Sequence, residues 1–301
     1  AGAAVRTVDL PRLTGGVLHT KFWLVDGVHL YIGSANMDWR ALTQVKELGA
    51  AIYNCSCLAE DLGKIFEAYW ALGVPDASIP APWPDSFSTS INLQSPLEVT
   101  LNGTEAAVFF SVGAAPVPGW GHRAGGQCAG VTVLGSPGWG HHTGVTIMGS
   151  LCWGSPHWGH HSEVTMLESL CWGYGCWPHS RAEMFPFLRS LAALADNGTR
   201  YGVQVRLFLV PSSAAQSRIP FARVSHTKYM VTDRAAYVGT SNWSGDYFER
   251  TAGSALVVAQ PGPGSGSFRE RLRAAFERDW SSRYSVDIGD TASWAGRCGP
   301  R

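Results

Sequence analysis

The chain has 301 residues, 45% of them apolar and 15% charged, which is enough to bury a core as one large domain or two small ones. Lysine plus arginine and aspartate plus glutamate are equal at 23 each, so no overall positive charge draws the protein to nucleic acid or anionic lipid. Any anion must therefore be bound by a local cluster of groups. No apolar run reaches the roughly 18 residues of a membrane-spanning helix.

The first part of the chain, residues 1–110, has the pattern of a small α/β unit. Apolar stretches rich in β-branched and aromatic residues predict strands at 17–25, 28–32 and 48–53. Apolar side chains at helical spacing then predict a helix at 58–72. Four prolines between positions 75 and 84 end the regular structure and predict a loop.

The middle part, residues 111–182, carries a tandem repeat of 19 residues. The period is marked by Trp120, Trp139, Trp158 and Trp177. Seven of the ten histidines lie here, which raises a metal-binding interpretation. A sequence rich in glycine and tryptophan with no amphipathic period has no evident means of bringing ligands together. We therefore expect a disordered, low-complexity insert, and no metal or other cofactor.

The last part, residues 183–301, repeats the plan of the first. Helices are predicted at 184–194 and 268–280, and strands at 203–210, 224–231, 236–238 and 254–259. The closing helices of the two parts share a Phe-Glu-x-x-Trp signature, at Phe66 and at Phe276. We therefore expect an α/β fold of two pseudo-symmetric lobes, each a mixed sheet flanked by helices, interrupted by the repeat.

A histidine, lysine and aspartate motif occurs twice in matched order, each time followed by Gly-[Ser/Thr]-x-Asn. The first copy has His19, Lys21, Asp26, Ser34 and Asn36, and the second has His226, Lys228, Asp233, Thr240 and Asn242. On a strand, residues i and i+2 face the same side, so each histidine is expected to share a face with its lysine. The duplication is much more specific than one short pattern and predicts one pocket built from both copies.

These residue types fit the cleavage of a phosphodiester. Displacement at phosphorus puts charge on the equatorial oxygens, which the two lysines and two asparagines can stabilise, with Ser34 and Thr240 as further donors. One histidine can attack phosphorus to form a phosphohistidine while the other protonates the leaving oxygen. One ring must start neutral and the other protonated, so activity is expected near or below pH ~6.5. Asp26 and Asp233 are candidate catalytic groups, although a carboxylate at a strand end also forms local turns.

The two motifs resemble those of the phospholipase D superfamily. The segments at 33–40, 42–49 and 239–244 are similar to phospholipase D family members 3 and 4, and the resemblance covers residues 5–110 and 184–285. It implies a 5′ to 3′ exonuclease on single-stranded DNA and RNA, with lipid transphosphatidylation also attributed to the group. It further implies a type II membrane glycoprotein of the endolysosomal lumen, reached through the endoplasmic reticulum and Golgi, and a homodimer.

The resemblance also assigns roles to individual residues. Glu47, 28 residues after His19, is expected to orient the ring of His19. His19 would be the nucleophile and His226 the general acid, with the reverse assignment also open. The residue 28 positions after His226 is Ser254, so the second histidine lacks a matching carboxylate, and Glu249 is the nearest substitute. The family's luminal domain and membrane anchor begin upstream of Ala1, so the chain is expected to be truncated at its N-terminus.

Other residues leave alternatives open. Trp23, Trp39 and Trp243 flank the motifs and could stack bases or pack in the core, and Trp243 is a candidate for substrate binding. Asn54, Asn102 and Asn197 stand in glycosylation sequons. Two competing functions are a lipid phosphodiesterase or transphosphatidylase and, from another class, a truncated and catalytically silent glycoprotein.

Overall fold

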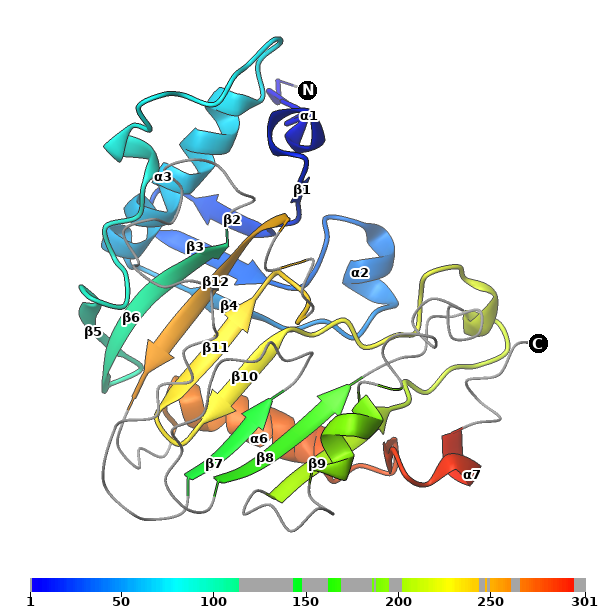
Figure 1. The fold of residues 1–301 in the computed structure, drawn as a ribbon. Helices are drawn as coiled ribbons and strands as arrows, with labels where there is room; N and C mark the ends of the chain where they lie inside the picture. The colour runs from blue at the N-terminus through cyan, green and yellow to red at the C-terminus, as the bar shows by residue number, and fades with distance from the viewer. Residues whose placement is uncertain are drawn as a thin grey trace.

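A computed structural model of the chain describes residues 2–113, 143–147, 162–168, 186, 188–194, 202–243, 247, 250–260 and 266–294. These residues form a mixed α/β fold with two sheets, one of three strands and one of ten (Figure 1). The sheets touch where β3 (His29–Gly33) contacts β11 (Ala235–Gly239) and β12 (Thr251–Ala259). Within the described segments, no helix has the length and apolar character needed to cross a membrane.

The same unit of three antiparallel strands and a helix occurs in both halves of the chain. In the first half it is β2 (Phe22–Val25), β3, β4 (Gly49–Ile52) and α3 (Ser56–Leu72). In the second half it is β10 (Tyr229–Thr232), β11, β12 and α6 (Phe268–Trp280). The repeated plan predicted from the sequence is therefore present.

Local sequence explains how each unit turns. Between β2 and β3 the chain reverses at Asp26 and Gly27, which have φ angles of 55° and 67°, as a type I′ hairpin requires at its two central residues. Between β10 and β11 the hydroxyl of Thr232 accepts hydrogen bonds from the backbone N–H groups of Arg234 at 3.2 Å and Ala235 at 2.9 Å. Both turns hold the hairpins in register, so that the strand ends beside the motifs are fixed.

The large sheet contains strands from both halves. Its order is β13 (Ser285–Asp287), β9 (Gly202–Phe208), β8 (Ser162–Glu168), β7 (Thr143–Ile147), β10, β11, β12, β6 (Thr104–Gly113) and β5 (Leu97–Leu101), with β1 (Val17–Leu18) parallel to β12. Seven residue pairs join β6 to β12. The sheet of the second half therefore extends into the first, because β6 occupies an edge of β12 that would otherwise expose unpaired backbone groups.

Two strands lie within the 19-residue repeat, where the sequence pattern predicts disorder. β7 pairs with β10, and β8 joins β7 to β9. Thr143 pairs with Ser162 and Ile147 with Met166, so the register between the two strands equals the period of the repeat. For these two segments the expectation of disorder is wrong, because successive copies of one sequence pair side by side as parallel strands. The other residues of the repeat, with its seven histidines, lie outside the described part.

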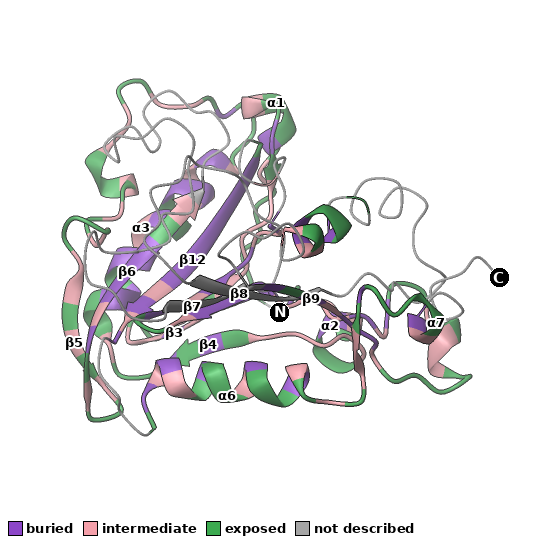
Figure 2. Cartoon of the chain, turned by 60° about the horizontal axis from the view of Figure 1, so that its bottom comes forward, coloured by how far each residue is buried: buried purple, intermediate pink, exposed green. Residues whose placement is uncertain are grey.

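Helices α3 and α6 cover the sheets through one apolar face each. The buried face of α3 includes Leu58, Leu62 and Ile65, and that of α6 includes Leu272 and Phe276 (Figure 2). The helix predicted at 184–194 is described as helical at residues 186 and 188–193. Short helices not predicted from the sequence are α1 (Leu10–Thr14), α2 (Trp39–Thr43) and α7 (Thr291–Trp294).

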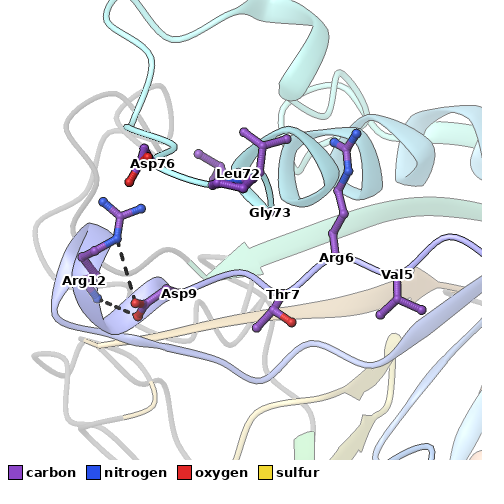
Figure 3. A pocket seen from close by; sticks show the side chains of 10 residues that line it. Val5, Arg6, Thr7, Asp9, Arg12, Leu72, Gly73 and Asp76 are labelled. Carbon is purple, nitrogen blue, oxygen red and sulfur yellow. Dashed lines mark hydrogen bonds and ion pairs between the residues drawn. The ribbon is translucent and has the colours of Figure 1, made fainter.

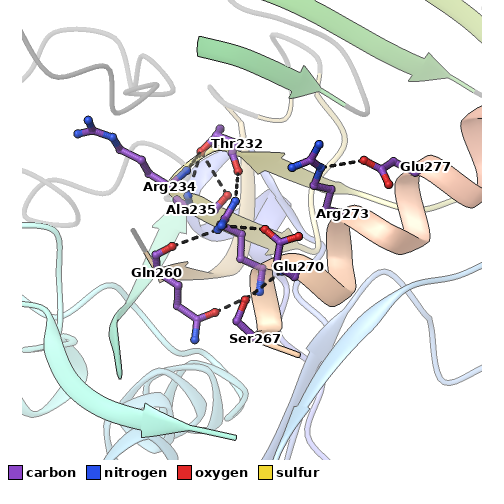
Figure 4. A network of polar contacts seen from close by, with 9 residues as sticks. Thr232, Arg234, Ala235, Gln260, Ser267, Glu270, Arg273 and Glu277 are labelled. Atoms are coloured by element: carbon purple, nitrogen blue, oxygen red, sulfur yellow. Dashed lines mark hydrogen bonds and ion pairs between the residues drawn. The ribbon is translucent and has the colours of Figure 1, made fainter. Parts of the chain in front are cut away.

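A buried polar network holds the start of α6 against the sheet. The Ser267 hydroxyl accepts a hydrogen bond from the backbone N–H of Glu270 at 3.2 Å and so caps the helix. Arg269, 5% exposed, donates to the backbone oxygens of Gln260 at 3.1 Å and Thr232 at 3.3 Å, and pairs with Glu270 at 2.8 Å. Figure 4 shows Thr232, Gln260 and Glu270 gathered at the start of the helix. One side chain thereby links α6 to the ends of β12 and β10.

Candidate active site

The two motif histidines lie in short segments that precede a strand. His19 follows β1, which belongs to the large sheet, and precedes β2 of the small sheet. His226 follows Ser225, which forms an isolated parallel bridge with Lys46, and precedes β10 of the large sheet. The expectation that each histidine and lysine sit within a regular strand is therefore wrong, because each segment first pairs with the opposite half of the chain and only then enters its own strand.

Each histidine is tied to the opposite half of the chain through its backbone. The N–H of His19 donates to Ala252 O at 2.9 Å, and the N–H of His226 donates to Lys46 O at 2.8 Å. This reciprocal exchange brings the two imidazole rings together with their centroids 6.5 Å apart and their planes at 78°. Residues separated by 207 positions in the sequence thus face one another across a single site.

The two lysines adopt the same arrangement in both halves. Lys21 Nζ donates to His19 O at 2.5 Å, and Lys228 Nζ donates to His226 O at 2.6 Å. Lys228 is buried and Lys21 half-buried. Burial lowers the pKa of Lys21 to about 8, with the carboxylate of Glu47 acting in the opposite direction. Two lysine side chains therefore flank the histidine pair, and that of Lys21 is protonated at acidic and neutral pH.

Glu47 contacts the second histidine, and the sequence-based expectation that it orients His19 is wrong. His226 Nδ1 lies 2.9 Å from Glu47 Oε1 and 3.1 Å from Oε2. The reason is the exchange between halves, because the bridge between Lys46 and Ser225 places Glu47 beside the incoming segment of the other copy. The carboxylate fixes the orientation of the His226 ring through Nδ1.

His19 is held by a neutral group instead. Its Nδ1 lies 2.9 Å from Thr240 O. A carbonyl oxygen can only accept, so Nδ1 carries the hydrogen, and in the neutral ring Nε2 keeps a free lone pair. The ring of Tyr247 packs edge-on against His19, with centroids 5.0 Å apart and an interplanar angle of 84°. His19 is thus fixed on two sides with an unprotonated nitrogen.

The electrostatic surroundings of the two rings differ. Burial, followed by the charges of Lys21 and Lys228, lowers the pKa of His19 to about 3. Burial also lowers the pKa of His226 below its usual value, but Glu47 opposes that shift through its hydrogen bond and its charge. His19 therefore favours the neutral form, whereas His226 has a carboxylate that stabilises its protonated form.

Four residues predicted to belong to the site make local contacts within the fold. Asp26 and Asp233 are exposed in the hairpin turns at the far ends of β2 and β10, and Asp233 faces Arg234 at 3.9 Å. Ser34 is buried and exchanges hydrogen bonds of 3.0 Å with the backbone of Leu48. Thr240 is also buried. Its hydroxyl accepts from Ser254 N–H at 3.0 Å. These hydroxyls hold strand ends together, and their part in substrate binding stays a prediction.

The remaining predicted residues differ in exposure. Asn36 is exposed and Asn242 half-buried at the strand ends beside the site. Trp243 is 3% exposed and packs against Tyr237 with ring centroids 5.0 Å apart, which contradicts a base-stacking role and supports a core role. Trp39 is exposed on α2, and Trp23 packs on Tyr31 at 4.7 Å between centroids.

Sequence reasoning missed three residues near the pair: Tyr247, Ser241 and Gly253. No pattern marks Tyr247. For Gly253 a signal was available in the spacing, because His19 precedes its motif glycine by 14 residues and His226 precedes its own by 13. Counted from the glycines, the position equivalent to Glu47 is Gly253 and not Ser254.

A separate cleft lies away from the histidines. It has a volume of about 630 Å³ and runs between the N-terminal segment and the end of α3, lined by residues including Arg6, Asp9, Arg12 and Asp76 (Figure 3). Its two arginines are engaged locally, Arg6 with Trp70 O at 2.6 Å and Arg12 with Ala77 O at 2.8 Å. The duplicated motif contributes no residue to this cleft.

Comparison with known proteins shows similarity to proteins of the phospholipase D type. Residues 1–117 match the family described as "PLD3/4, PLD-like domain". The chain is 48% identical to 5′-3′ exonuclease PLD3 of Xenopus laevis over 99% of its length, and 47% identical to human PLD3 over 98%. It is 45% identical to human 5′-3′ exonuclease PLD4 over 98% of its length.

The chain is similar to the PLD3 and PLD4 members of the phospholipase D superfamily. It spans 62% of the length of each PLD3 named above and 61% of human PLD4. Among solved structures, the phosphatidylserine synthase of Haemophilus influenzae aligns with a TM-score of 0.48 at 12% identity, covering 90% of this chain and 63% of that one.

Proposed function

We propose that this chain is a member of the phospholipase D superfamily and a phosphodiesterase that acts as a 5′ to 3′ exonuclease on single-stranded DNA and RNA. The observation that carries the proposal is the convergence of two histidines, 6.5 Å apart, from the two halves of the chain. The homology to 5′-3′ exonucleases over almost the whole chain supports the choice of nucleic acid. Because the chain covers less than two thirds of those proteins, the activity is a proposal for this chain.

The proposed reaction has two steps. In the first, His19 Nε2 attacks phosphorus and the bond to the leaving oxygen breaks, while His226 Nε2–H donates its proton to that oxygen. In the second, His226, now neutral, takes a proton from water, the resulting hydroxide attacks phosphorus, and the phosphorus–nitrogen bond to His19 breaks. The hydrogen bonds to Thr240 O and Glu47 favour this assignment over its reverse, because only His226 has a carboxylate to stabilise its proton.

Charge on the phosphoryl oxygens is stabilised by groups at the pocket. Lys21 and Lys228 lie beside the rings as fixed cations, and Asn36 and Asn242 supply neutral N–H donors from the strand ends. Preorganised donors of this kind contribute roughly 100-fold or more in rate each. The aspartates of the motif take no part in this scheme, since both lie in distant turns.

The decisive experiment incubates the purified chain with 5′-labelled single-stranded DNA at pH 5.5 in the presence of a chelator. His19→Ala and His226→Ala should each abolish turnover. His29→Ala is a matched control, because His29 lies at the far end of the β2–β3 hairpin and accepts a backbone hydrogen bond from Asn54. Absence of turnover from a folded sample would contradict the enzyme proposal and favour a silent glycoprotein, and turnover of phosphatidylglycerol vesicles alone would favour a lipid phosphodiesterase.

We further propose that the protein acts in the endolysosomal lumen as a membrane-anchored glycoprotein, in keeping with the family. Asn54 and Asn102 are exposed and have φ angles of 54° and 51°, so both sequons lie in accessible turns. Asn197 lies outside the described residues. The lumen is acidic, which suits a site that needs one protonated histidine. Dimerisation stays a prediction.

A further inference from the structure

The two halves of the site differ at one structurally equivalent position. Two backbone hydrogen bonds of 3.0 Å fix the alignment of the strands: Ser34 N–H to Leu48 O, and Thr240 N–H to Ser254 O. The residues that precede these two acceptors are Glu47 and Gly253. Where the first half presents a carboxylate to the opposite histidine, the second half therefore has no side chain.

The space beside Gly253 is already filled. A Cβ atom at Gly253 would lie 1.8 Å from Ser241 Oγ and 3.1 Å from Ser241 Cβ. The first is far below any real contact, so the hydroxyl would have to move. The equivalent of Ser241 in the first half is Ala35, which has no hydroxyl. In the first half Ala35 stands beside Glu47, and in the second half Ser241 stands beside Gly253. In each pair one residue has a polar side chain and the other leaves room for it.

We propose that Ser241 and Gly253 act together as positioning residues that keep a carboxylate away from His19, and so make the two histidines chemically unequal. Among the residues that the structure describes, His19 has no carboxylate partner, and its Nδ1–H donates to the carbonyl of Thr240, whereas His226 takes Glu47. Glu249, the substitute expected from the sequence, lies outside the described residues. A carbonyl orients a ring without stabilising an added positive charge as a carboxylate does. This inference deepens the proposed function and rests on it for the roles of nucleophile and acid.

The test installs the missing carboxylate. Ser241→Ala with Gly253→Glu frees the space and places a glutamate opposite His19, and Ser241→Ala with Gly253→Gln is the neutral control of the same size. We would follow the His19 ring by NMR titration in the full chain, in a His226→Asn background. The glutamate variant should raise the His19 pKa by about 1 to 3 units relative to the glutamine variant. Equal titration of the two variants would overturn the proposal.

Because the titration is read on the resting protein, it tests the inference even if no nuclease activity is found. In an active chain, the acidic limb of kcat/KM against pH should move upward in the glutamate variant only. If the variant with Ser241→Ala and Gly253→Glu does not fold, a double-mutant cycle of thermal unfolding tests whether Ser241 fills the space beside Gly253. Gly253→Ala should lower Tm in the parent chain and much less in the Ser241→Ala chain, since the clashing oxygen is then gone. An equal loss in both would show that Ser241 does not occupy the site.

Discussion

The two motif histidines, His19 and His226, have different hydrogen-bond partners. His19 donates to a backbone carbonyl and lies among lysines, whereas His226 contacts both oxygens of a glutamate. Burial and the lysine charges oppose protonation of His19, whereas Glu47 partly offsets the same opposition at His226, so His226 is the better candidate for the acid. The duplicated motif supplies the same residue types from both halves of the chain. The different partners, Thr240 for His19 and Glu47 for His226, make the two histidines unequal.

The role of Glu47 can be tested by a conservative change. Glu47→Gln keeps the size of the side chain but removes the charge that stabilises protonated His226. We expect kcat to fall by roughly 100-fold to 10,000-fold, by analogy with the loss of a carboxylate behind a catalytic histidine. Glu60→Gln, on the exposed face of α3, is the control and should leave kcat unchanged. A wild-type rate for Glu47→Gln would exclude the pairing as a functional contact.

The pH dependence follows from the two histidines. His19 must be neutral, which holds above its lowered pKa of about 3, and His226 must be protonated, which holds only below its own pKa. That value is itself below the ordinary 6.5 because of burial. We therefore expect kcat/KM to be highest in the acidic range and to fall about tenfold per pH unit above the His226 pKa. An optimum above pH 7 in a profile from pH 3.5 to 8 would contradict this assignment.

Among the elements, α6 depends on a buried charge at its first turn. Arg269 donates to backbone oxygens on two strands, and it pairs with Glu270 on its own helix. Four residues later Arg273 forms an ion pair of 2.8 Å with Glu277 on the solvent side, where both side chains are more than half exposed. The same residue type thus makes a docking contact at one position and a surface pair at the next turn.

This difference predicts unequal stability effects. Arg269→Ala leaves buried carbonyl oxygens without a donor and should lower the free energy of unfolding by about 3 kcal/mol. Arg273→Ala removes an exposed pair worth about 0.5 kcal/mol or less. Urea denaturation of both variants measures the two values. Comparable losses would show that the network at the start of α6 does not hold the helix to the sheet.

At the scale of the whole molecule, the large sheet is continuous only through the repeat. β7 and β8 stand between β10 and β9, so that β9 and β13 reach the rest of the sheet through them. Every backbone N–H within such central strands faces a neighbour. Residues 143–147 and 162–168, whose sequence pattern predicts a disordered insert, therefore connect β9 and β13 to β10 and the rest of the large sheet.

Proline substitution tests this connection. Thr146→Pro together with Thr165→Pro removes two ladder donors from central strands and should markedly lower the unfolding midpoint. Ser78→Pro, in the exposed proline-rich loop that follows α3, is the control and should have little effect. If all three prolines leave the midpoint unchanged, the repeat lies outside the cooperative fold.

Much of the fold was predictable from local patterns. The hairpin turn at Asp26 and Gly27, the amphipathic α3 and α6, and the paired histidines and lysines all follow from short-range spacing. The partner of Glu47 was not predictable in this way, because it depends on pairing between residues more than 170 positions apart, as in the contact of Glu47 with His226. The strands of the repeat were not predicted because its glycine-rich and tryptophan-rich composition indicates low complexity. The short runs at 144–147 and 163–166, which pair with each other, do not stand out from that composition.

The pairing of β1 with β12 also determines when the first half of the chain can finish folding during synthesis. Val17 pairs with Thr251, so a ribosome must synthesise more than 230 further residues before the segment that leads into His19 has its neighbour. Contacts between such distant residues slow folding. The newly made first half must wait with an open strand edge, and we expect it to need protection by chaperones until the last strands emerge.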